Sequence, residues 1–457
     1  MLFGNGSRSY KIDMCSGPIV SRLLLFTGPL VLSSVLQLLF NAADVVVVGK
    51  YAGDNSLAAV GSVGPLINLM VALFIGLSIG SNVLASHYYG SGNEQQLSKT
   101  VHTSMLISII GGIILTVAGV IFSRHILIWM DSPAETLPLA TVYLKLYFLG
   151  MPASMVYNFG SAILRAVGDT RRPMYYLTAA GVINVILNLF FVISLHMDVA
   201  GVATATVISQ IVSAVLVTRC LFNESGALKL QIRKLSIDGY ILARIIRIGL
   251  PASFQGMLFS LSNVIIQSSV NNFGATVVAG NSAAQNIEGF VYVSMNAFYQ
   301  ACISFISANV GARHYERINK ILVRAEICVI ITGMLLGGSA YLFSYTLLGI
   351  YTDSLAVIEA GAVRMACVSL PYFLCGMMDV MVGALRGIGY AILPMIVSLV
   401  GACGLRLLLI FTIFKLPRFH ETRFLYLMYP ISWTVTFLAH VVCFIIVKRK
   451  FDRVHGQ

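Results

Sequence analysis

Charged residues are scarce in this chain: they make up 11% of its 457 residues, whereas 58% are hydrophobic. A soluble domain carries about 25% charged residues, so this composition excludes a soluble globular protein. The chain also lacks the motifs HExxH, GxSxG and GxxxxGK followed by Ser or Thr, and its eight histidines form no ligand pair. These absences exclude a zinc hydrolase, a serine hydrolase and an ATP-driven pump. We therefore expect neither enzyme activity nor a cofactor.

Paired cysteines are absent as well. The eight cysteines include no CxxC spacing, and nearly all lie in apolar segments. In such segments a cysteine acts as a small hydrophobic side chain, so we expect neither disulfides nor a metal site. The N-terminus lacks a basic segment followed by a short apolar run and a small-residue cleavage site, so we expect no cleaved signal peptide.

Long apolar segments are abundant. A helix of about 20 apolar residues spans a bilayer and satisfies its own backbone hydrogen bonds there. We expect an all-α integral membrane protein with twelve transmembrane helices. The predicted spans are 20–47, 57–83, 99–122, 138–160, 174–195, 199–221, 241–268, 279–306, 321–343, 357–384, 391–414 and 425–447.

A repeated motif divides these spans into two halves. The pattern LRxxGxxxxPM occurs at Leu164–Met174 and again at Leu385–Met395. An internal repeat with an even number of spans predicts two six-helix lobes, related by a pseudo-two-fold axis along the membrane normal. Further matches at nearly the same offset pair Pro29 with Pro251 and Gly90 with Gly311.

Basic residues predict the orientation in the membrane. The net charge is +12, and most Lys and Arg fall on one side if both termini are cytoplasmic. This is the positive-inside distribution of a cell-membrane protein, so we expect contact with membrane lipids and not with nucleic acid. The expected organisation is a cytoplasmic N-terminal segment 1–19, an N-lobe 20–221, a cytoplasmic linker 222–240, a C-lobe 241–447 and a basic tail 448–457.

One carboxylate stands out in the first predicted span. Asp44 shares a helix face with Gln37 and Asn41 because the three are spaced i, i+4 and i+7. An isolated carboxylate in hydrocarbon either holds a proton or binds a cation, and neutral oxygens can complete a cation's shell. The alternative is a structural aspartate bonded to a neighbouring helix, with amides that join helices. The predicted proton or cation site consists of Asp44, Asn184, Asn188 and Thr206. The only metal ion that we expect there is Na⁺.

A longer polar stripe on one helix face marks the eighth predicted span and contains the acid Glu288. It consists of Asn281, Gln285, Glu288, Tyr292, Asn296 and Tyr299. A polar face of this length is typical of a cavity wall. Arg406 needs a partner if it is buried, and Glu288 or Asp379 would supply it; a purely structural pair is the alternative. Three acids inside the spans, counting Asp44, against the single base Arg406 favour cationic, flat, apolar substrates. The predicted cavity residues are Gln37, Asn41, Gln255, Asn263, Gln285, Glu288, Tyr292, Asn296, Asp379 and Arg406.

Several segments together resemble the multidrug and toxic compound extrusion (MATE) transporters of bacterial type. They are GPLVLSSVLQLLFNAADVVVVG, GVATATVISQ, GACGLRLLLI and the two motif copies. The resemblance implies a V-shaped central cavity and exchange of an organic molecule for Na⁺ or H⁺. It also implies that Asp44 is the carboxylate of the first-lobe cation site, with Asn184, Asn188 and Thr206 as companions. Many members have an aspartate where this chain has Asn188, so both coupling ions stay open.

The expected function is therefore secondary active antiport: a monomer exports organic, cationic amphipathic compounds by alternating access. A flippase for lipid-linked precursors is the alternative, since it would share the fold. Such a flippase needs a cationic cavity for pyrophosphate, and the expected excess of acids argues against one. A membrane scaffold or receptor would have no use for isolated acids inside its spans.

Overall fold

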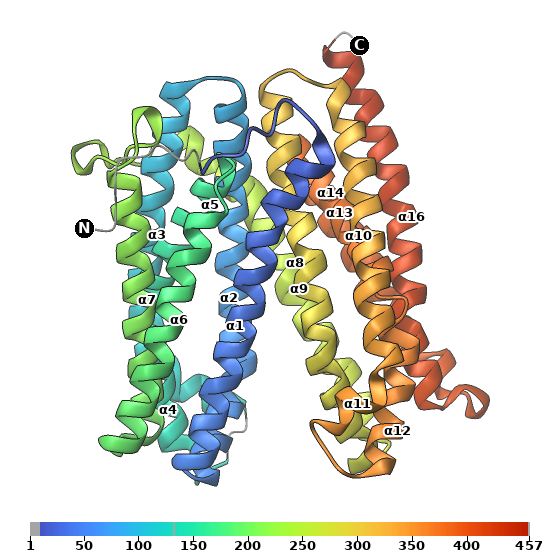
Figure 1. Cartoon of the computed structure of the whole chain (residues 1–457). Coiled ribbons are helices and arrows are strands. Elements are labelled where there is room, and N and C mark those ends of the chain that lie inside the picture. Colours follow the sequence, from blue (N-terminus) through green and yellow to red (C-terminus); the bar gives the residue numbers. More distant parts are fainter. Residues whose placement is uncertain (1–9, 131–132, 456–457) are drawn as a thin grey trace.

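The computed structural model describes residues 10–130 and 133–455, which form helices joined by loops (Figure 1). Helices α1 to α7 form one half of the molecule, and π-helix η1 continues α6. Their bounds are α1 (Ile19–Tyr51), α2 (Asp54–Gly90), α3 (Glu94–Trp129), α4 (Leu137–Leu149), α5 (Met151–Ala166), α6 (Arg171–Leu189), η1 (Phe190–Ser194) and α7 (Asp198–Phe222).

A linker with two short 3-10 turns, η2 (Gly226–Leu228) and η3 (Ile232–Lys234), leads to the second half. In that half, π-helices η4 and η5 interrupt two of the spans. The bounds are α8 (Gly239–Asn271), α9 (Ala275–Gly311), α10 (Glu316–Leu342), α11 (Ser344–Gly349), α12 (Leu355–Arg364), η4 (Met365–Ser369), α13 (Phe373–Ile388), α14 (Ile392–Ser398), η5 (Leu399–Gly404), α15 (Leu405–Phe411), η6 (Ile413–Lys415), η7 (Pro417–Phe419) and α16 (Thr422–His455).

The prediction of twelve spans is confirmed. In the described part of the chain, 11 helical segments are long and apolar enough to cross a membrane, and the pair α4–α5 makes a twelfth span bent by 45°. The bend falls at Gly150, with Pro152 in the first turn of α5. Proline removes one backbone hydrogen bond there, which permits the change of direction.

Both copies of the repeated motif form the same turn between two spans. Gly168 joins α5 to α6 and has a φ of 86°, and Gly389 joins α13 to α14 with a φ of 106°. Side chains other than glycine rarely adopt such angles. The motif's proline follows in the first turn of the next helix, as Pro173 and Pro394. The repeat in sequence is therefore a repeat in structure.

The two lobes meet most closely at the end of the molecule that holds the linker, and their ribbons diverge toward the other end (Figure 1). The close contact needs glycine. A Cβ atom on Gly90 would lie 2.0 Å from the carbonyl oxygen of Ala308, and one on Gly311 would lie 1.9 Å from that of His87. These matching glycines let the last turns of α2 and α9 pack backbone to backbone.

The segment before α1 also joins the lobes at this end. The amide of Ile12 donates to the Gly168 carbonyl in the first lobe, 3.1 Å away. The carbonyl of Met14 accepts from the Asn309 side chain of the second lobe at 2.9 Å. Lys11 forms an ion pair with Glu224 in the linker at 2.8 Å. The segment from Tyr10 to α1 is thus bonded to both lobes.

Candidate functional site

The first lobe holds a small polar cluster around Asp44, which is half-buried on α1. The side-chain amide of the fully buried Asn188 on α6 donates to the Asp44 carboxylate. The same amide lies 3.3 Å from Asn184 Oδ1. The Asn184 amide donates in turn to Thr206 Oγ1 on α7, at 3.4 Å. Tertiary packing thus brings the four predicted residues together from three helices.

Two tyrosines that sequence reasoning missed lie beside this cluster. Tyr143 and Tyr147 on α4 are close enough to Asp44 to interact electrostatically with it, and Tyr147 shares a hydrogen bond with Gln210. They stand one helical turn apart in an apolar segment, and that spacing was the only signal in the sequence.

The cluster offers oxygens of two kinds. Asp44 supplies a carboxylate, and the buried Oδ1 atom of Asn188 has no hydrogen-bond partner within the described chain. An unpartnered buried acceptor is costly, and a proton on Asp44 or a hard cation beside it would relieve that cost. No group of three or more His, Cys, Asp or Glu side chains is arranged to hold a metal among the described residues. A carboxylate beside neutral oxygens is chemically suited to hold a proton or a single cation.

A cavity of about 520 Å³ is lined mainly by helices of the second lobe, α8 among them, and also by α2 of the first lobe. Of the ten predicted cavity residues, six line it: Gln255, Asn263, Tyr292, Asn296, Asp379 and Arg406. The wall is completed by Ala72, Ile75, Gly76, Ile79, Ala252, Gly256, Phe259, Ser260, Tyr299, Tyr372, Cys375, Met378, Val382, Arg386, Tyr429 and Trp433.

The other four predicted cavity residues lie elsewhere. Gln37 and Asn41 on α1 and Gln285 on α9 are exposed and do not line this cavity. Glu288 is buried against a different neighbour, Arg364 at the end of α12. The polar stripe of α9 therefore has two different environments. Its first half packs against Arg364, and only its second half borders the cavity.

Glu288 and Arg364 form a buried, bidentate ion pair. Arg364 Nε and Nη2 donate to the two carboxylate oxygens of Glu288 at 3.1 and 2.7 Å. The third nitrogen, Nη1, donates to Asn281 Oδ1 at 2.9 Å. Ser369 in η4 donates to Glu288 at 3.3 Å. Each charged group is 3% exposed, so the pair is a closed, neutral unit.

The expectation that Glu288 or Asp379 pairs with Arg406 was wrong. Arg406 Nε donates to Ser432 Oγ on α16 at 2.7 Å, and its guanidinium lies over the rings of Tyr429 and Trp433. Neither Glu288 nor Asp379 pairs with it in the described chain.

The expected count of three acids against one base inside the spans was also wrong. Arg364 and Arg386 are buried bases, and both carboxylate oxygens of Glu326 on α10 are buried as well. The predicted tenth span, 357–384, contained Arg364 and ended just before Arg386. In the structure, α13 extends to Ile388.

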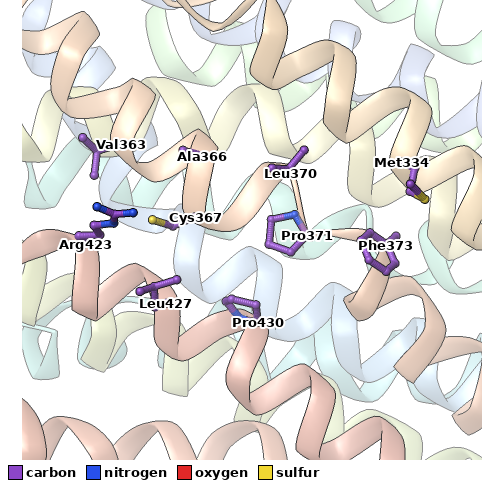
Figure 2. Close-up of a pocket in the computed structure, with 10 residues that line it drawn as sticks. All are labelled: Met334, Val363, Ala366, Cys367, Leu370, Pro371, Phe373, Arg423, Leu427 and Pro430. Atoms are coloured by element: carbon purple, nitrogen blue, oxygen red, sulfur yellow. The ribbon is translucent and has the colours of Figure 1, made fainter.

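A larger hollow of about 680 Å³ lies on the outer face of the second lobe (Figure 2). Except for Arg423 its lining is apolar or sulfur-bearing, and Met334 and Leu370 there are about half exposed. Large apolar side chains such as Ile114, Ile121 and Val442 cover other outer helix faces in the same way. Such a surface suits contact with hydrocarbon, so the polar cavity is the better candidate for a solute.

Twelve spans in two repeated lobes, with a polar cluster around Asp44 in one lobe and a polar cavity in the other, define a membrane transporter and not an enzyme. The MatE family model matches residues 29–190 and 251–412, one match for each lobe. The chain belongs to the MatE family of membrane transporters.

Relatives and solved structures agree with this assignment. A "probable multidrug resistance protein", YoeA of Bacillus subtilis, is 28% identical over 93% of both chains. The "FAD transporter" of Shewanella oneidensis is 24% identical over 76% of this chain and 77% of its own length. The outward-facing structure of a multidrug resistance MATE family transporter superposes with a TM-score of 0.88 at 21% identity, covering 98% of this chain and 99% of the other.

Proposed function

We propose that this protein exports organic compounds from the cell in exchange for H⁺ or Na⁺ by alternating access. The observation that carries the proposal is the separation of two sites. A lone carboxylate with amide and hydroxyl companions lies in the first lobe, and a polar cavity lies in the second. Sequence similarity to a probable multidrug resistance protein supports export of organic molecules.

Asp44 is the proposed coupling residue. While it is ionised, its charge in the membrane interior has no ion-pair partner among the described residues, only a hydrogen bond from the neutral Asn188 amide, which is costly. Uptake of a proton or Na⁺ removes that cost and lets α1 repack against α6 and α7. Pro29 lies inside α1 and leaves one backbone hydrogen bond unmade, so a bend is easiest there. An ion that binds one facing more tightly shifts the balance between the two facings.

The proposed orientation places both termini and the linker in the cytoplasm, with lobes at 20–221 and 241–447. The end at which the lobes meet is then the cytoplasmic end, and the conformation described above is outward-facing. We further propose that the transporter acts as a monomer in the cell membrane, in contact with anionic lipid.

The charge of the cargo does not follow from a count of acids and bases. Cationic substrates were predicted from an excess of acids, and the buried arginines remove that premise for the second lobe. The two arginines in the cavity also favour the second candidate function, a flippase for lipid-linked precursors, because a pyrophosphate binds cationic side chains. We therefore expect either a cationic compound or an isoprenoid phosphate to be recognised.

Transport by purified protein in liposomes tests the proposal. Fluorescent organic ions of either charge are loaded, and a Na⁺ or a pH gradient is imposed separately. We expect one gradient to drive transport by the wild type and Asp44→Asn to abolish the gradient-dependent part. The matched control is Asp353→Asn, which neutralises an exposed acid outside the spans and should transport normally. Gradient-driven transport by Asp44→Asn at the wild-type rate would refute the coupling role of Asp44.

A further inference from the structure

Three arginines are buried in the second lobe, and their charges are balanced very differently. Arg364, Arg386 and Arg406 are each 3% exposed. Arg364 has Glu288 as its counterion. No ion pair in the described chain includes Arg386 or Arg406. Since burial of an uncompensated charge is costly, the cavity that these two side chains line is poised to take up negative charge.

The bonds of Arg386 fix it in place without neutralising it. Its Nη2 atom donates to Gln255 Oε1 on α8 at 2.8 Å, and Nη1 donates to the hydroxyl of Tyr299 on α9. The Nε atom is buried and has no partner among the described residues. Guanidinium nitrogens form strong, directed bonds to carboxylate and phosphate oxygens, and one such donor remains unused.

Arg406, which also lines the cavity, is held in a similar way. Its Nε atom is occupied by Ser432, while the Tyr429 ring lies 4.5 Å and the Trp433 ring 5.6 Å from the guanidinium carbon. Stacking on rings orients a guanidinium and leaves its charge in place. Asp379 is the acid of the cavity and interacts electrostatically with Arg386. Even when Asp379 is ionised, two positive charges face one negative charge.

Aromatic rings form one continuous wall of the same cavity. The centroids of Tyr292 and Tyr372 lie 6.5 Å apart, those of Tyr372 and Trp433 5.1 Å, and those of Trp433 and Tyr429 5.7 Å. Neighbouring rings of this kind stack well against a planar ligand. The cavity volume of about 520 Å³ falls within the usual range of small-molecule sites.

We propose that this cavity binds an organic anion with a planar aromatic ring system. Its carboxylate, phosphate or sulfonate lies between Arg386 and Arg406, and its rings lie against Tyr292, Tyr372, Trp433 and Tyr429. The assignment gives the motif arginine Arg386 a role in cargo recognition and makes Asp379 an unfavourable neighbour of the anion. It rests on the proposed transport function only for the later release of that cargo.

Binding to purified protein in detergent tests the proposal without a gradient. Carboxyfluorescein and rhodamine 123 share a xanthene ring system but carry opposite charges. We expect the anion to bind more tightly to the wild type in fluorescence anisotropy titrations. Arg386→Gln and Arg406→Gln should each weaken that binding by about 10- to 100-fold, the usual loss for a hydrogen bond to a charged group. Lysine at either position should restore part of it, and Asp379→Asn should strengthen it.

A control and a local probe keep the result interpretable. Arg423→Gln removes an exposed arginine of the same lobe outside the cavity, so anion affinity should not change. The chain has two tryptophans, so in Trp129→Phe the fluorescence of Trp433 reports on the cavity. An aromatic anion should quench it, and this measurement does not depend on the arginine variants folding.

Tighter binding of rhodamine 123 than of carboxyfluorescein would overturn the proposal, as would unchanged anion affinity in both arginine variants. Tight, arginine-dependent binding of farnesyl phosphate without binding of the aromatic anion would overturn the aromatic part and favour the flippase. Anion binding without transport under any gradient would refute the proposed antiport and leave this site standing. Gradient-driven transport of cations alone, without anion binding, would overturn the anion site and support the proposed antiport.

Discussion

Replacing Glu288 by glutamine should destabilise the protein more than any other single neutralisation in the second lobe. The substitution keeps the size of the side chain but leaves Arg364 buried at 3% exposure without a counterion. The two hydrogen bonds of Arg364 at 3.1 and 2.7 Å would then go to a neutral amide and no longer to a carboxylate. Its other contacts are the hydrogen bond to Asn281 and the rings of Tyr426 and Tyr429, and all of these are neutral. Breaking one side of a buried ion pair costs about 3–5 kcal/mol.

The reverse substitution should cost less. In Arg364→Met the carboxylate that remains can take up a proton and become neutral, whereas a guanidinium cannot lose one in a protein. The double variant Glu288→Gln/Arg364→Met removes both charges together. It should therefore be more stable than the sum of the two single effects predicts, with a coupling free energy of about 0.5–3 kcal/mol, the range for residues in contact.

The native cysteines allow a direct assay. Six of the eight are buried, so a thiol-reactive fluorescent dye reports unfolding as detergent-solubilised protein is heated. For a cooperative unit of lobe size, the loss in Glu288→Gln corresponds to a fall in melting temperature on the order of 10 °C. A melting temperature equal to that of the wild type, or strictly additive effects in the double variant, would show that the pair does not stabilise this lobe.

Two further predictions concern the end at which the lobes meet. Burial acts to raise the pKa of Glu224, but its hydrogen bond with Lys11 and its ion pair with Arg172 outweigh that effect, so the pKa lies below the ordinary value of 4.5. The resulting stabilisation of the folded protein is present above pH 4.5 and is lost as the pH falls through the folded-state pKa. Melting curves from pH 7 to pH 3 should show this loss in the wild type and a smaller one in Glu224→Gln, and identical pH profiles would contradict it. Gly90→Ala should push α2 and α9 apart at a cost of about 1–3 kcal/mol, because the new Cβ would meet the Ala308 carbonyl oxygen. Maleimide labelling of Ser304→Cys at the inter-lobe contact should then become faster, whereas Gly61→Ala on the same helix, with no atom within 4 Å of its new Cβ, should leave the labelling rate unchanged.

The sequence by itself determined the membrane spans and their division into two lobes. Lipid offers no hydrogen-bond partners, so each span must form all its backbone hydrogen bonds within one apolar helix. Such long apolar segments can be located from hydropathy along the sequence. The repeated motif located the second lobe for a similarly local reason, since Gly168 and Gly389 each make a turn with positive φ. Asp44 was also identifiable from the sequence, because a lone acid among valines is costly wherever the helix packs.

Only the tertiary structure decided which charges are neutralised. Glu288 and Arg364 belong to different helices, and nothing in the local sequence says which buried arginine has a carboxylate partner. Packing of α12 against α9 gives Arg364 its carboxylate, while Arg386 and Arg406 line a cavity in which neither forms an ion pair with a described residue. An ion pair across helices depends on distances of a few ångströms that no single segment encodes. The sign of the charge in the cavity therefore followed from the packing of the helices and not from a count of acids and bases.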